Sequence, residues 1–217
     1  MSASSSLKTN GQGWKELWQH RSFKFQFCFF LLCIVGIALF FPRYFDYLEG
    51  RNGTFLNDLI VCRIPATDVS WLVFFLLYSG MVIGLVCSLR YPKVCLIIMQ
   101  TYVLVTVMRI ITLYFFPLNP PEGYIALKEP ILSLFFTTNG IICSKDLFFS
   151  GHVSTILSLY YPVKQKLYKN IILAFSIMIG LLVLIQHVHY TIDVLVSPVA
   201  TYACYLFAKN VLSKKYS

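Results

Sequence analysis

Residues 69–89, VSWLVFFLLYSGMVIGLVCSL, and residues 94–116, VCLIIMQTYVLVTVMRIITLYFF, are separated only by the tetrapeptide RYPK at 90–93. Each stretch is apolar over a length that matches the roughly 20 residues a helix needs to cross the hydrocarbon core of a bilayer. The short basic link leaves no room for a soluble domain between them. The pair therefore predicts two consecutive transmembrane helices.

The rest of the chain continues this pattern of apolar segments and short polar links. The fourth segment is short and directly follows a Ser-Gly-His triplet, so it either enters the membrane from a site at the surface or lies half-buried. The composition agrees, because 58% of the 217 residues are hydrophobic and only 12% are charged, whereas a soluble globule carries about 25% charged residues. The sequence therefore predicts an all-α integral membrane protein, a bundle of six helices, at residues 23–41, 69–89, 94–116, 148–162, 169–188 and 191–208.

The chain is expected to form a single domain. We expect a cytoplasmic N-terminal segment at residues 1–22, the six-span body at 23–212 and a cytoplasmic tail at 213–217. Residues 1–21 show no early apolar region followed by a small-residue cleavage site, so the first span is expected to be retained.

The cations predict the orientation of the helices. The net charge of +9 comes largely from one set of ends and links, and cytoplasmic loops of membrane proteins collect Lys and Arg. The other loops contain most of the acidic residues. Both termini are therefore predicted in the cytoplasm, because 12 of the 18 cations fall on one side: Lys8, Lys15, Arg21, Lys24, Arg90, Lys93, Lys164, Lys166, Lys169, Lys209, Lys214 and Lys215.

Three groups of polar residues fall on the opposite, extracytoplasmic side of this topology. One is Ser150-Gly151-His152, at the start of the fourth span. The second is the segment 187–193, HVHYTID, between the last two spans. The third is Arg109 with Thr112, about two turns before the outer end of the third span. Their convergence at one membrane surface predicts an active site there.

The residue types favour phosphoryl transfer. His189 and Asp193 are four residues apart and share a face of a helix, so the carboxylate can hold one ring nitrogen and leave the other free as a base or a nucleophile. Ser150-Gly151-His152 at a helix start offers backbone N–H groups to a phosphate. Two histidines from different segments could then flank one phosphorus atom, one attacking and one protonating the leaving oxygen.

The other polar residues have simpler interpretations. His187 is expected to be a packing residue, because a spacing of two points it away from His189 on a helix. A metal site built from these histidines and Asp193 is not expected, because three ligands on one helical turn do not converge. Arg109 could reach the lipid headgroups, but an ionisable residue this deep in a span favours a functional role. No cofactor is expected.

These motifs resemble a known family. Ser150-Gly151-His152, followed by His189-Tyr190-Thr191-Ile192-Asp193, is similar to the type-2 phosphatidic acid phosphatase superfamily, and within it to the sphingomyelin synthase-like branch. The resemblance implies that His189 is the nucleophile, that His152 is the acid and base, and that Asp193 orients the nucleophile. It also places Arg109, Thr112 and Asp146 in motifs of that branch, so the predicted substrate-binding residues are Arg109, Thr112, Asp146, Ser150, Gly151 and Tyr190.

The resemblance also bears on the substrate. The phosphatases of the superfamily carry a Lys…Arg-Pro motif, a Pro before Ser-Gly-His and a Ser-Arg ahead of the second histidine. Here Phe149 precedes Ser150, Leu182-Val183 fill the Ser-Arg place, and no Lys…Arg-Pro is found. A phosphomonoester dianion needs such cations, whereas a phosphodiester with a choline or ethanolamine group carries its own. We therefore expect a zwitterionic headgroup.

The predicted function is transfer of phosphocholine or phosphoethanolamine from a glycerophospholipid donor to ceramide or a similar lipid alcohol such as diacylglycerol. The alternatives are a lipid phosphatase of the same superfamily and a non-catalytic lipid-binding membrane protein. We expect a multi-pass protein of an endomembrane or the plasma membrane, or of the inner membrane if bacterial. A homodimer is possible and no nucleic acid partner is expected. The sequence does not decide whether Cys62 and Cys143, in the two outer loops, form a disulfide.

Overall fold

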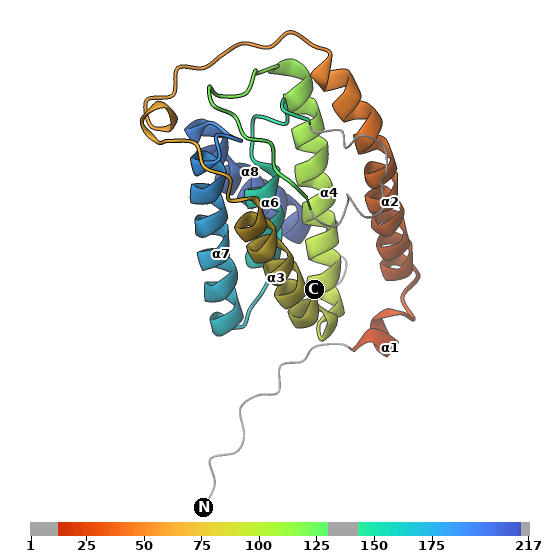
Figure 1. The fold of residues 1–217 in the computed structure, drawn as a ribbon. Helices are drawn as coiled ribbons and strands as arrows, with labels where there is room; N and C mark the ends of the chain where they lie inside the picture. The colour runs from red at the N-terminus through yellow and green to blue at the C-terminus, as the bar shows by residue number, and fades with distance from the viewer. Residues whose placement is uncertain (1–12, 130–142, 214–217) are drawn as a thin grey trace, which may run out of the picture.

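The computed structural model describes residues 13–129 and 143–213, and the regular elements within these ranges are all helices. Figure 1 shows them packed side by side as a bundle. The helices are α1 (Trp14–Leu17), α2 (Arg21–Glu49), α3 (Ser70–Leu89), α4 (Pro92–Phe115), α6 (Gly151–Tyr160), α7 (Lys166–Ile185) and α8 (Thr191–Phe207), with a 3-10 turn at Val61–Arg63 and a π turn at Ala208–Leu212.

Five of these helices are long and apolar enough to cross a membrane: α2, α3, α4, α7 and α8 with its continuation to Leu212. Their positions agree with five of the six predicted spans. The first is longer than predicted, because α2 accommodates Pro42 and continues to Glu49. Pro92 is the first residue of α4. Proline suits this position because the N–H groups in the first turn of a helix have no partner within the helix, so none is lost.

The predicted fourth span, 148–162, is not a full membrane-crossing helix. α6 has only ten residues, about 15 Å at the usual rise per residue, against a hydrocarbon core of about 30 Å. The helix begins late because Ser150 is held by α8, where its backbone N–H donates to the carbonyl oxygen of Asp193 at 3.2 Å. The half-buried alternative is the better description of this segment.

α6 lies in the middle of the bundle, where it contacts α3, α4, α7 and α8. α6 approaches α8 closely where small hydroxyl residues lie between them. The hydroxyl of Ser197, on α8, donates to the carbonyl oxygen of Ser150 at 3.2 Å. The hydroxyls of Ser154 and Thr201 donate to carbonyl oxygens one turn earlier in their own helices, so these buried polar groups are satisfied locally. Small residues of this kind let membrane helices pack closely.

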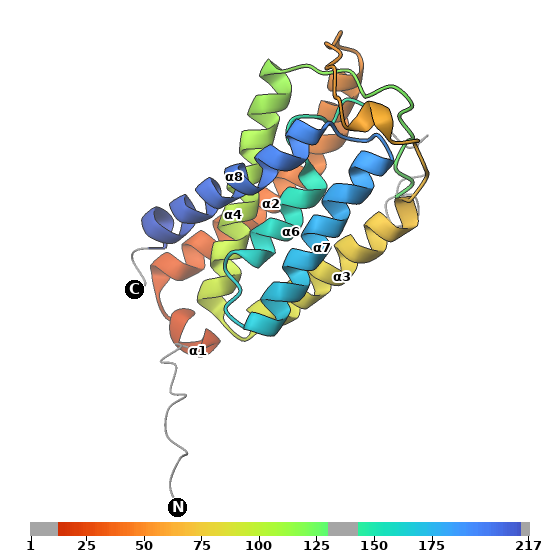
Figure 2. The same cartoon turned by 90° about the vertical axis from the view of Figure 1, so that its left-hand side faces the viewer.

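The long connections of the chain gather at one end of the bundle. Residues 50–69, 116–129 and 143–150 and the link between α7 and α8 all lie at the upper end in Figure 1. The links 90–91 and 161–165 lie at the other end, as the second view confirms (Figure 2). The polar segments 143–150 and 186–190 therefore meet beside the N-terminal ends of α6 and α8.

Candidate active site

The two predicted histidines lie next to each other in the bundle. His152 is the second residue of α6, and His189 lies in the link just before α8. Their ring centroids are 6.1 Å apart and the ring planes are inclined by 68°. The ring of Phe74, on α3, lies edge-on to His152 with a centroid separation of 6.0 Å. Two segments 37 residues apart in sequence thus meet at one place, as their predicted common membrane surface implies.

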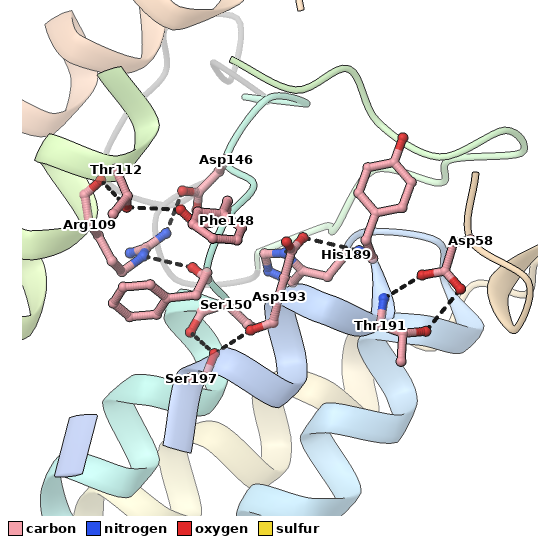
Figure 3. A network of polar contacts seen from close by, with 12 residues as sticks. Asp58, Arg109, Thr112, Asp146, Phe148, Ser150, His189, Thr191, Asp193 and Ser197 are labelled. Carbon is pink, nitrogen blue, oxygen red and sulfur yellow. Dashed lines mark hydrogen bonds and ion pairs between the residues drawn. The ribbon is translucent and has the colours of Figure 1, made fainter. Parts of the chain in front are cut away.

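His189 is oriented by Asp193, four residues later in the first turn of α8 (Figure 3). The Nδ1 atom of His189 lies 3.3 Å from Oδ2 of Asp193, and both side chains are essentially inaccessible to solvent. The same oxygen accepts a hydrogen bond of 3.0 Å from the backbone N–H of Tyr190. The carboxylate therefore fixes the ring and also caps the helix that carries it, which agrees with the predicted orienting contact.

Four buried polar side-chain atoms have no hydrogen-bond partner within residues 13–129 and 143–213, and all four lie in this site. They are Ser150 Oγ, His152 Nδ1, His189 Nε2 and Asp193 Oδ1. Buried polar groups in folded proteins are almost always paired, so a cluster of unpaired ones indicates groups reserved for a ligand or a reaction. His189 Nε2 is free because Nδ1 faces the carboxylate.

Arg109 comes from α4 and is almost fully buried, with 10% of its side chain exposed. Its Nη2 atom forms an ion pair with Oδ1 of Asp146, and its Nε donates to the carbonyl oxygen of Phe149 at 3.1 Å (Figure 3). The guanidinium also lies directly over Gly151, where an added Cβ would come within 2.5 Å of the Arg109 Cζ atom. A side chain at this position would require the Arg109 guanidinium to move from its contacts with Asp146 and Phe149.

Thr112, one turn after Arg109, ties the segment before α6 to α4. Its hydroxyl lies 2.9 Å from the carbonyl oxygen of Phe148 and 3.0 Å from that of Arg109. Thr112 and Arg109 therefore hold the backbone carbonyl groups of Phe148 and Phe149. Their predicted contact with substrate stays a prediction.

Tyr190 and His187 hold the loops around the site. The hydroxyl of Tyr190 donates to the carbonyl oxygen of Asn119 at 2.9 Å and accepts from the N–H of Leu56 at 3.2 Å. The ring nitrogens of His187 lie beside the carbonyl oxygens of Glu122 and Ile64. His187 is thus engaged with these loops and not with His189. The two histidines lie in a turn and not on a helix, so their helical spacing is not the reason. The hydroxyl of Tyr190 is already engaged within the protein.

Asp58 is a residue near the site that the sequence did not single out. Its carboxylate lies at the start of α8, where Oδ2 accepts from the N–H of Thr191 at 2.5 Å and Oδ1 accepts from the Thr191 hydroxyl at 3.0 Å. Burial tends to raise the pKa of Asp58, but hydrogen bonds from Thr191, Val61 and Ile60 outweigh it and hold the pKa below its usual value. No local pattern around Asp58 marks a partner 133 residues away.

The cysteines and other ligand-type residues add no further group to the site. Cys62 and Cys143 both have free thiols. Burial and then the nearby charge of Asp146 raise the pKa of Cys143 to about 12, so this thiol stays protonated. In the described part of the chain, no cluster of three or more His, Cys, Asp or Glu has a geometry that could hold a metal ion.

Comparison with known proteins supports a class for this site. The family model described as PAP2 superfamily C-terminal matches residues 142–210. This range contains α6, α7 and α8, and with them His152, His189 and Asp193. This part of the chain is therefore similar to the C-terminal region of the PAP2 superfamily. A search of the curated proteins and a search of the solved structures found no match.

Proposed function

We propose that this protein is a membrane lipid phosphotransferase that moves phosphocholine or phosphoethanolamine from a glycerophospholipid to ceramide or a similar lipid alcohol. The proposal depends on one observation above all, the four unpartnered buried atoms of Ser150, His152, His189 and Asp193. A phosphoryl group between the two imidazoles would give Nε2 of His189 a bonding partner and His152 a proton-transfer partner.

In the first step, Nε2 of His189 attacks the phosphorus of the donor lipid. The bond from phosphorus to the diacylglycerol oxygen breaks, and His152, which takes up a proton when the anionic donor binds beside it, gives that proton to the leaving oxygen. Diacylglycerol leaves, and the headgroup phosphate stays bound to His189 as a phosphohistidine. Asp193 keeps Nδ1 protonated and stabilises the charge that develops on the ring, which is the role of the carboxylate in a catalytic triad.

In the second step, His152 removes the proton from the primary hydroxyl of the acceptor lipid. The acceptor oxygen attacks phosphorus, the bond to Nε2 of His189 breaks, and His152 is left protonated for the next cycle. One residue can serve as acid and then as base because the second half-reaction is the reverse of the first, with a different lipid alcohol. No metal ion is required in either step.

The charges of the site favour a phosphodiester over a phosphomonoester. Arg109 already has a carboxylate partner, Asp146, so the pair adds no net charge to the site. A phosphomonoester dianion would need more uncompensated positive charge, as phosphoryl-transfer sites usually provide. A phosphodiester carries one negative charge, which the Ser150 hydroxyl and the free N–H groups of the first turn of α6 can stabilise.

The decisive experiment uses the purified protein in lipid nanodiscs with headgroup-labelled phosphatidylcholine, with and without ceramide. We expect label to move to ceramide, and the His189→Ala variant to transfer none. Release of soluble phosphocholine or phosphate with no dependence on ceramide would identify a hydrolase instead. No turnover of phosphatidylcholine, phosphatidylethanolamine or phosphatidic acid would favour a lipid-binding protein.

The positive-inside pattern supports an active site on the extracytoplasmic or lumenal face. A single cysteine introduced by Lys166→Cys into a cysteine-free variant tests this orientation. It should stay unlabelled when intact cells or sealed vesicles meet a membrane-impermeant maleimide, and it should react after permeabilisation. Labelling before permeabilisation would reverse the orientation.

A further inference from the structure

The loop after α2 is connected to both sides of the candidate site. Its residue Thr54 pairs with the segment after α4, accepting from the N–H of Asn119 at 3.0 Å and donating to the carbonyl oxygen of Pro117 at 3.0 Å. Four residues later, Asp58 binds the first residue of α8. The segment 54–58 therefore joins the helix that carries Arg109 to the helix that carries Asp193.

Asp58 makes an unusually complete set of contacts for a loop carboxylate. Besides the two bonds to Thr191, its Oδ1 accepts from the N–H of Ile60 at 3.0 Å and of Val61 at 3.1 Å. The carboxylate thus caps the 3-10 turn of its own loop and also binds the first amide of α8, a contact that Figure 3 shows. A negative group at a helix start also interacts favourably with the helix dipole.

We propose that Asp58 is a positioning residue that keeps His189 in contact with Asp193 by fixing the first turn of α8. The segment between His189 and Asp193 is short, and two consecutive backbone N–H groups in it are bound by carboxylates. Asp193 takes the N–H of Tyr190, and Asp58 takes the N–H of Thr191. Since Asp193 is in that turn and His189 precedes it, a shift of the turn changes the 3.3 Å contact between them.

This inference rests on the proposed function for its kinetic test, since it concerns how the same site is held. Asp58→Asn keeps the size of the side chain but places an N–H₂ group where an acceptor is needed. We expect kcat for headgroup transfer to fall about tenfold with KM within about twofold, because a misplaced nucleophile loses transition-state stabilisation rather than substrate binding. Thr191→Val should cost about threefold, and Thr191→Ser should restore near-normal turnover.

The chain offers a matched control in Asp68. Its carboxylate also serves a helix start, accepting from the N–H and the hydroxyl of Ser70 at 3.1 and 2.7 Å, but on α3. Asp68→Asn should leave kcat per folded protein unchanged. The double variant Asp58→Asn/Thr191→Val should be no slower than Asp58→Asn alone, because the two residues belong to one contact.

A measurement independent of turnover completes the test. Proteins labelled with ¹⁵N-histidine, assigned with the His189→Gln variant, report by NMR which ring nitrogen of His189 carries the proton. The wild type and Asp68→Asn should show protonated Nδ1, and Asp58→Asn should show a mixture of the two tautomers. A single unchanged tautomer in Asp58→Asn, or equal kcat losses in Asp58→Asn and Asp68→Asn, would overturn the inference. A wild type with no turnover would refute the proposed function, and the tautomer result would still decide the role of Asp58.

Discussion

Removing Asp146 alone should destabilise the protein more than removing Asp146 and Arg109 together. The two side chains are 22% and 10% exposed, so Asp146→Ala would leave a largely buried guanidinium without its carboxylate. Breaking a buried pair in this way costs about 3–5 kcal/mol. Because Asp146 keeps some exposure, we expect the lower end, about 3 kcal/mol. For a chain of this size, that corresponds to a fall in Tm of about 6–12 °C.

Thermal unfolding in detergent micelles, followed by tryptophan fluorescence, measures this effect. The double variant Arg109→Met/Asp146→Ala should recover to within about 1 kcal/mol of the wild type, since an apolar replacement of a buried pair is often neutral. The exposed pair of Lys128 and Asp68, with its atoms 2.8 Å apart, is the control, and Asp68→Ala should shift Tm far less. The reasoning is refuted if Asp146→Ala behaves like Asp68→Ala, or if the double variant is as unstable as the sum of its single changes.

Four further predictions follow from the site and its surroundings. His189→Ala should abolish a trapped, labelled phosphoenzyme, whereas His152→Ala should still form it from a donor with a good leaving group, because such a group needs no proton; label retained in His189→Ala would exclude this nucleophile. Asp193→Asn should lower kcat by roughly 10²–10⁴-fold while its Tm stays near that of the wild type, and a loss of folding instead would mark a structural role. Gly151→Ala should cost about 1–3 kcal/mol of stability by overpacking and lower turnover, and a neutral result would contradict the close approach of the guanidinium. Hydrogen bonds from Lys128 and then Ser70 lower the pKa of Asp68 from 3.8 to about 2. The ionised Asp68 therefore stabilises the fold fully above pH 3.8, and this stabilisation is lost as the pH falls through about 2. The Tm difference between the wild type and Asp68→Asn should shrink over that pH range.

The sequence by itself determined the parts of this protein that depend on local pattern. Long apolar runs predict α3, α4, α7 and α8 because a helix in a bilayer satisfies its own backbone hydrogen bonds and needs only length and hydropathy. The contact of His189 with Asp193 was predicted from their spacing of four on one helix face, but His189 lies in the link before α8, so the contact forms across the start of that helix. The pairing of His152 with His189 followed from the resemblance and from their common membrane surface.

Only the tertiary structure decided the contacts between distant segments. The fourth apolar segment looks like a short span, but its polar start is bonded to α8, so only ten residues are helical. The sequence marked Arg109 and Asp146 separately, and only packing shows that they form an ion pair across 37 residues. Asp58 reaches Thr191 across 133 residues. Hydropathy and spacing describe neighbours along one helix, whereas the partner of a buried charge depends on which helices pack together.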